Sequence, residues 1–159
     1  MAQDSAEEEV LLKAAYLYNF AKFTRWPEDA MGEPGAPLSL CIAGGDDLAD
    51  VLERLRGKLV KGRPLSIQTI KDGRALRGCQ MLYVAVSEQQ RYPDLVKSAR
   101  GQPVLTVSEL PGFSDSGGII EIFREHERIR FIINLGVARR AGLEISPNLL
   151  KLAVQVDQE

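Results

Sequence analysis

Side chains that could take part in catalysis are few in this sequence. His126 is its one histidine, and it stands among charged residues between two apolar runs, where an exposed turn is expected. Without a second histidine, a nucleophilic serine or cysteine lacks its usual partner for proton transfer. Ser87 and Ser108 each follow an apolar run, but neither lies in a G-x-S-x-G motif, so we interpret both as capping residues. The sequence therefore predicts no catalytic residue and a protein that is not an enzyme.

Potential metal ligands are equally sparse. One histidine and the two separated cysteines, Cys41 and Cys79, match no zinc-ligand spacing. The acidic pair Asp46-Asp47 and the run Glu7-Glu8-Glu9 are explained by the preference of acidic residues for the first turn of a helix. We predict neither a metal site nor a cofactor.

The best candidate for a small-ligand site is a turn rich in glycine, AGGDD at residues 43–47, which follows an apolar run of strand length. In open α/β sheets, ligands lie beyond the carboxyl ends of the strands, and glycines there let a ligand approach the backbone. Neither G-x-G-x-x-G nor a Walker A sequence is present, and the two aspartates would repel phosphate. A small-molecule sensor with a pocket at these strand ends is the alternative function that we carry forward.

Length and charge restrict the class of protein. A chain of 159 residues fits one domain. Twenty basic and 22 acidic residues give a net charge of −2, and the basic residues are scattered, which argues against a nucleic-acid partner. No apolar run approaches the roughly 20 residues of a membrane span, so we expect no direct membrane insertion. The first ten residues lack the basic and apolar regions of a secretory signal, so the protein is either cytosolic or a mature sequence whose signal has been removed.

The pattern of apolar residues predicts an α/β fold. A helix is predicted from about Glu7 to Trp26, ended by Pro27. Further helices are predicted at 48–56, at 87–99, where Pro93 either splits the helix or starts it anew, and at 137–141. A last helix is predicted from Ser146, its N-cap, with a buried face that holds Leu149, Leu150, Leu152, Ala153 and Val156. Strands are predicted at 38–43, 64–70, 81–86, 104–107, 119–124 and 129–134. Strands separated by helices indicate a mostly parallel central sheet with helices on both faces. The turn at 125–128 is too short for a crossover, so the last two strands form a C-terminal antiparallel hairpin. We expect one domain over residues 7–159, preceded by a disordered tail at 1–6.

The first helix carries two apolar faces where a surface helix needs one. One face holds Val10, Leu11, Ala14, Leu17, Tyr18 and Ala21; the other holds Leu12, Tyr16, Phe20 and Phe23, with Asn19 and Trp26 at its edge. Either another part of the domain covers the second face, or its aromatic residues meet a partner or a second copy of the chain.

Two further segments could contribute to a binding surface. Phe113 stands in a polar loop, SELPGFSDSGG at residues 108–118, where it is either a partner anchor or a plug over the core. In RIRFIIN, alternation places Arg130, Ile132 and Asn134 on one face, a mixed surface that suits either protein binding or coverage by a helix. The predicted partner-binding residues are Tyr16, Asn19, Phe20, Phe23, Trp26, Phe113, Arg130, Ile132 and Asn134.

Four blocks of sequence, in the same order, resemble the YfiR family of periplasmic regulators (YfiR/HmsC-like). They are KAAYLYNFAKFTRWP, LTVSELPGF, GGIIEIF and RIRFIINLGVARRAGLEISPNLLKLA, which together extend from Lys13 to Ala153. The resemblance implies a secreted inhibitor that binds the periplasmic sensor region of a YfiN-type membrane-anchored diguanylate cyclase. It thereby implies lower cyclic di-GMP signalling and less biofilm formation. A homodimer is also expected, because one apolar patch repeated by a twofold axis can bury itself.

The resemblance favours a mature periplasmic protein whose signal peptide has been removed, and it bears on the two cysteines. By the residues alone, Cys41 and Cys79 are either two buried thiols or a bridge between adjacent strands. In an oxidising compartment the disulfide is favoured. Family members can carry a second cysteine pair near the position of Gly118 to Arg124, and this chain has none there.

Overall fold

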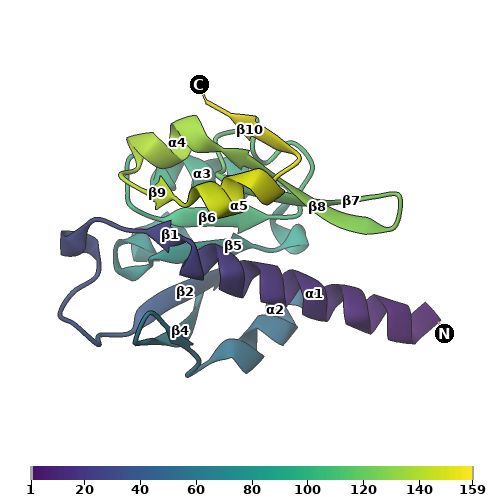
Figure 1. Cartoon of the computed structure of the whole chain (residues 1–159), viewed down its shortest axis with the longest axis horizontal. Coiled ribbons are helices and arrows are strands. Elements are labelled where there is room, and N and C mark those ends of the chain that lie inside the picture. The colour runs from purple at the N-terminus through teal and green to yellow at the C-terminus, as the bar shows by residue number, and fades with distance from the viewer. Residues whose placement is uncertain (1, 159) are drawn as a thin grey trace.

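The computed structural model describes residues 2–158, and its centre is a sheet of eight strands (Figure 1). The order across the sheet is β10-β8-β7-β6-β5-β2-β4-β3. The strands are β2 (Leu38–Ala43), β3 (Leu59–Val60), β4 (Arg63–Ile70), β5 (Met81–Val84), β6 (Leu105–Ser108), β7 (Ile120–Glu125), β8 (Arg128–Asn134) and β10 (Gln155–Asp157). A separate antiparallel pair joins β1 (Thr24–Arg25) to β9 (Glu144–Ile145).

Most of the sheet is parallel, as predicted. Strands β4, β2, β5, β6 and β7 pair in parallel, and β10 runs parallel to β8. The antiparallel pairs are β7 with β8 and the short β3 with β4. The two-residue loop of the β7–β8 hairpin is His126-Glu127, and both residues have positive φ, 49° and 67°. This is the backbone twist that suits a two-residue hairpin loop. The predicted fold class is confirmed.

Helices cover both faces of the sheet. The α-helices are α1 (Ala2–Lys22), α2 (Asp47–Leu52), α3 (Tyr92–Ala99), α4 (Leu135–Arg140) and α5 (Pro147–Leu152), and the 3-10 turns are η1 (Glu28–Ala30), η2 (Glu53–Leu55), η3 (Gly73–Gly78) and η4 (Val86–Glu88). Helices α1, α2, α4 and α5 share one apolar cluster with residues such as Leu40, Leu105 and Ile133. Helix α3, η3 and Phe113 share the cluster on the other face.

A disulfide joins β2 to the residue two positions before β5. The Cys41 and Cys79 Cα atoms are 5.9 Å apart, within the usual range for a bridge, and both residues are buried. The two strands are neighbours in the sheet, which brings the cysteines together. The predicted disulfide is therefore present.

Several predicted boundaries were wrong. The last helix ends at Leu152, and Val156 lies in strand β10 rather than on a helix face. Helix α3 begins at Tyr92 rather than at Ser87, which confirms the alternative that Pro93 starts the helix anew: Pro93 occupies the first turn, where a missing N–H costs nothing. Helix α1 begins at Ala2 rather than near Glu7. The disorder predicted for residues 1–6 stays a prediction, and Met1 lies outside the described residues.

Candidate functional site

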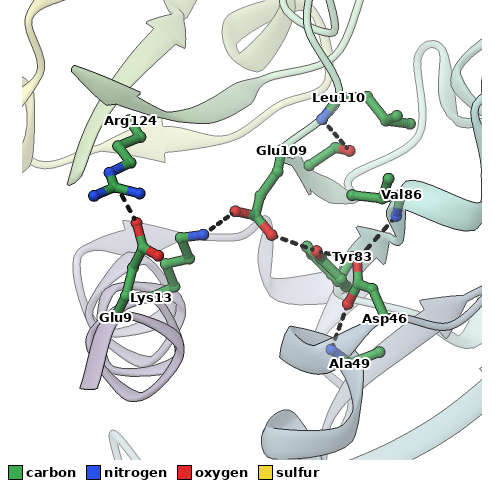
Figure 2. A network of polar contacts seen from close by, with 10 residues as sticks. Glu9, Lys13, Asp46, Ala49, Tyr83, Val86, Glu109, Leu110 and Arg124 are labelled. Atoms are coloured by element: carbon green, nitrogen blue, oxygen red, sulfur yellow. Dashed lines mark hydrogen bonds and ion pairs between the residues drawn. The ribbon is translucent and has the colours of Figure 1, made fainter. Parts of the chain in front are cut away.

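The carboxyl ends of the central strands are occupied by a network of the protein's own polar groups (Figure 2). Asp46 follows β2 and caps α2, because its Oδ1 accepts a hydrogen bond of 2.7 Å from the Ala49 N–H. Its Oδ2 accepts from the Val86 N–H at 2.9 Å and from the Tyr83 hydroxyl at 2.8 Å. Asp46 lies in the turn that was predicted to bind a small ligand, and both of its carboxylate oxygens therefore accept hydrogen bonds from the protein itself.

The network continues to α1. The Tyr83 hydroxyl also lies 3.2 Å from Glu109 Oε2, and Lys13 forms an ion pair with the Glu109 carboxylate. One turn earlier in α1, Glu9 Oε1 lies 3.7 Å from Arg124 Nε on β7 (Figure 2). These contacts tie the first helix to strand ends that are remote in sequence.

Close packing explains why position 44, in the turn after β2, holds a glycine. Gly44 has a φ of +84°, and a Cβ there would lie 2.5 Å from Ser87 Oγ and 2.6 Å from Glu88 Cγ. The neighbouring Gly45 N–H donates to Ser87 Oγ at 2.9 Å. The protein's own η4 segment thus occupies the close approach that a ligand was predicted to use.

A pH prediction follows from the network. Burial, reinforced by the charges of Asp46 and Glu109, strongly raises the pKa of Tyr83 above its ordinary 10.0. In the unfolded chain Tyr83 ionises near pH 10, whereas the folded state keeps the proton, so this contribution to stability is complete below pH 10 and is lost above it. We expect the unfolding free energy to fall by up to about 1.4 kcal/mol per pH unit above pH 10, and the fall to be smaller in Tyr83→Phe. Urea unfolding of both proteins between about pH 9 and 11 measures this, and equal slopes would refute it.

A surface groove of about 940 Å³ lies between α1 and the β7–β8 hairpin. Both elements extend on the same side of the molecule (Figure 1). The lining residues are Ala6, Glu8, Glu9, Leu12, Tyr16, Arg124, Glu127, Arg128, Ile129, Arg130, Phe131, Leu152 and Val154. The groove is therefore lined by residues near both ends of the chain and by residues of the hairpin.

The groove combines apolar walls with charges of both signs. Leu12 is 44% exposed and Leu152 is 68% exposed, unusual for large apolar side chains. The Tyr16 ring packs edge-on against Phe131 with ring centroids 5.9 Å apart, which fixes it in the wall. Glu125 Oε1 lies 3.3 Å from Arg130 Nε. Apolar centres with charged borders are typical of surfaces that bind proteins.

The structure brings two of the predicted partner-binding residues, Tyr16 and Arg130, into this groove. Asn19 is exposed elsewhere on α1, Ile132 is half-buried on the same face of β8 as Arg130 but does not line the groove, and Phe23 lines a smaller hollow of about 370 Å³ beside β1 and β9.

The other four predicted residues are buried. Phe20 packs against Phe131 at a centroid distance of 5.0 Å, and the Trp26 indole N–H donates to the Gln80 carbonyl at 2.9 Å. The Asn134 side chain donates to the Ser114 carbonyl and caps α4 through the Val137 N–H. Phe113 is wholly buried, as the core-plug alternative predicted. These four side chains serve the core of this structure, and their assignment to partner binding has no exposed surface to support it.

Sequence reasoning missed several residues of the groove. Leu12 was placed on the second apolar face of the first helix but not among the binding residues. Glu9 and Arg124 pair across the groove, and no local pattern marks such a contact between distant segments. Leu152 was assigned to the buried face of a longer helix, whereas α5 ends there and leaves it exposed.

Residues 2–158 contain no cluster of three potential metal ligands among His, Cys, Asp and Glu. In the same residues, no helix has both the length and the hydropathy that crossing a bilayer requires.

Comparison with protein families places the chain. A family model described as YfiR/HmsC-like matches residues 11–154, which include the groove residues from Leu12 to Val154, the disulfide and every strand of the eight-stranded sheet except β10. The match therefore covers the fold and most of the candidate site. This chain belongs to the YfiR/HmsC-like family.

Proposed function

We propose that this protein is a periplasmic regulator that represses a membrane-anchored diguanylate cyclase by binding its periplasmic sensor region. The family match over residues 11–154 carries this proposal, because the family suggests regulation of diguanylate cyclase signalling. The Cys41–Cys79 disulfide is compatible with the oxidising periplasm. Repression would lower cyclic di-GMP synthesis and biofilm formation, and the protein itself would act by binding rather than by catalysis.

The groove between α1 and the hairpin is the proposed docking surface. It supplies exposed Leu12 and Leu152 together with the fixed ring of Tyr16 and the guanidinium groups of Arg128 and Arg130. Repression by binding requires that the protein prefer the inactive arrangement of the cyclase, since a ligand shifts an equilibrium only through differential affinity. A surface whose Tyr16 ring is held by packing against Phe131 can discriminate between two such arrangements.

Leu12→Asp is expected to weaken binding to the cyclase's periplasmic region by about tenfold or more, because it places a charge at the apolar wall of the docking surface. Leu59→Asp is the matched control, since Leu59 is 60% exposed in β3 at the edge of the sheet remote from β8. Both substitutions replace an exposed leucine by a negatively charged aspartate. The measurement is the affinity of each purified variant for the periplasmic region, beside its effect on cyclic di-GMP synthesis by the full-length cyclase in membranes.

Repression lost with Leu12→Asp and kept with Leu59→Asp is the expected result. Equal affinities for the two variants would show that the docking surface lies elsewhere. Absence of repression by the unmodified protein, tested with the cyclase of its own bacterium, would refute the proposed function itself.

Self-association is a separate part of the proposal. The groove exposes apolar side chains near both ends of the chain, and a twofold axis could bury one such patch against its copy. Sedimentation at several protein concentrations tests the predicted homodimer directly.

A further inference from the structure

One edge of the sheet is left without a neighbouring strand where it borders the groove. Strand β8 begins at Arg128, but β10 pairs with it only from Ile132 onward. On that side, residues 128–131 of β8 therefore have no adjacent strand within the described chain. Arg128, Ile129, Arg130 and Phe131 all line the groove.

The hairpin register decides which backbone groups face this open edge. In a two-residue hairpin the residues that flank the loop, Glu125 and Arg128, exchange hydrogen bonds, and the bonded pairs then alternate along the ladder. Arg130 is consequently bonded to Phe123, while Ile129 and Phe131 direct their backbone groups away from β7. The Val154 N–H donates to the Phe131 carbonyl at 3.0 Å, which agrees with this direction. The Ile129 N–H and C=O thus point toward the open edge.

The side chains around the edge define what could bind there. Alternation places the Ile129 and Phe131 side chains toward α1, where Phe131 contacts Tyr16, and places Arg128 and Arg130 on the opposite face. A strand added beside β8 would follow the same alternation. Every second side chain would face the apolar wall of Leu12 and Tyr16, and the others would lie beside Arg128 and beside Arg130, whose Nε lies 3.3 Å from Glu125 Oε1.

We propose that the groove binds an extended segment of the partner protein, which adds to the open edge of β8 as a further strand. The favoured segment alternates apolar residues, directed at Leu12 and Tyr16, with acidic residues directed at Arg128 and Arg130. Main-chain hydrogen bonds give such strand addition its affinity, and the alternating side chains give it specificity. This inference rests on the proposed function, because it specifies how the same groove recognises the cyclase.

The opposite edge of the sheet makes a useful contrast. Strand β3 pairs with β4 only at Arg63 and Pro64, so within the described chain the outer edge of β4 at residues 66–70 also lacks an adjacent strand, although the Arg56 side chain donates to the Ile67 carbonyl at 3.2 Å. The exposed side chains there are the polar Gln68 and Thr69. Both sides of the sheet thus have an edge without an adjacent strand, whereas the apolar wall of Leu12 and Tyr16 borders only the edge of β8.

The decisive variant is Ile129→Pro, which removes the outward N–H and replaces the isoleucine side chain with the proline ring. Proline is tolerated on an edge strand when its missing N–H faces away from the ladder. Ile129→Ala is the matched control, since it shortens the side chain and keeps the N–H. We expect Ile129→Pro to bind the cyclase's periplasmic region about tenfold more weakly than Ile129→Ala, the effect of losing one well-formed interfacial hydrogen bond.

Amide hydrogen exchange of the unmodified protein tests the same point without a variant. The probe is a short capped peptide in which valine and glutamate alternate, and its control is the same peptide with alternate amides N-methylated. The expected result is slower exchange of the Ile129 amide with the first peptide, no change with the second, and no change at Thr69 on the opposite edge.

The outcomes separate this inference from the proposed function. If the cyclase region binds and Ile129→Pro and Ile129→Ala bind it equally, strand addition is wrong while the proposed function stands. If the cyclase region does not bind, the proposed function is wrong, and protection of Ile129 by the peptide still supports strand addition. Protection of Ile129 in the protein alone, rising with its concentration, would assign the edge to a second copy and overturn the partner-segment proposal.

Discussion

Replacing Phe113 by alanine is expected to lower the free energy of unfolding by about 3–5 kcal/mol, the usual cost of emptying a buried aromatic site. The Phe113 side chain has 0% exposure and shares a cluster with Val96 and Leu110, and its ring lies 6.0 Å from that of Tyr92. A Cβ at Gly118 would fall 2.2 Å from the Phe113 ring, so the chain passes directly against it. The neighbouring groups therefore have little freedom to move into the cavity that the substitution would leave. Urea unfolding of the variant measures the loss.

Hydrogen bonds to Glu121 hold the loop that carries Phe113 in place, so we expect a large loss of unfolding free energy. The buried Glu121 carboxylate accepts hydrogen bonds from the Ser114 N–H at 2.9 Å and from its hydroxyl at 3.0 Å, and from the Gly112 N–H at 3.3 Å. Phe113→Leu is the control, because it keeps much of the apolar volume and should cost less. Variant protein that remains folded should bind the partner with unchanged affinity. A loss below about 1 kcal/mol together with abolished partner binding would instead make Phe113 an anchor.

Loss of the Cys41–Cys79 disulfide is expected to cost about 3–4 kcal/mol of stability. The bridge closes a segment with a sequence separation of 38 residues, and closing a loop of that length limits the entropy of the unfolded chain. Urea unfolding with and without a thiol reductant gives the difference. The double variant Cys41→Ala, Cys79→Ala should be destabilised to a similar extent and should not respond to the reductant.

The location of the bridge limits its expected effect on binding. Cys41 packs in the apolar cluster on the α3 face, whereas the groove residues Tyr16 and Phe131 belong to the cluster on the α1 face. Reduction should therefore weaken repression only by lowering the folded fraction. Identical unfolding curves with and without reductant would contradict the stability prediction. A weaker affinity in reduced protein that is still folded would show that the disulfide shapes the docking surface.

Much of the architecture was determined by local sequence. Apolar runs of strand length separated by amphipathic segments predicted the parallel sheet, and the short EHER turn predicted the antiparallel hairpin. The helix starts were also predictable from local sequence. Asp46, one of the acidic pair assigned to the start of a helix, and Ser146, where the last helix was predicted to begin, accept hydrogen bonds from the first turns of α2 and α5. These features depend on periodicity and on contacts within a few residues, and such information is contained in a short stretch of chain.

The functional surface was decided by tertiary structure. The sequence showed that the first helix has two apolar faces, but only packing against Phe131 from β8 covers Phe20 and leaves Leu12 exposed. The sequence left open whether Phe113 binds a partner or fills the core. The contacts of its loop with Glu121 and Gly118 place it in the core. Strand β10 pairs with β8 from Ile132 onward and so limits the open edge to the start of β8. It has only three residues, too few for an alternating pattern that would predict a strand. In each case coverage depends on residues far away in the chain, and the pattern of one segment carries no information about which distant segment will bury it.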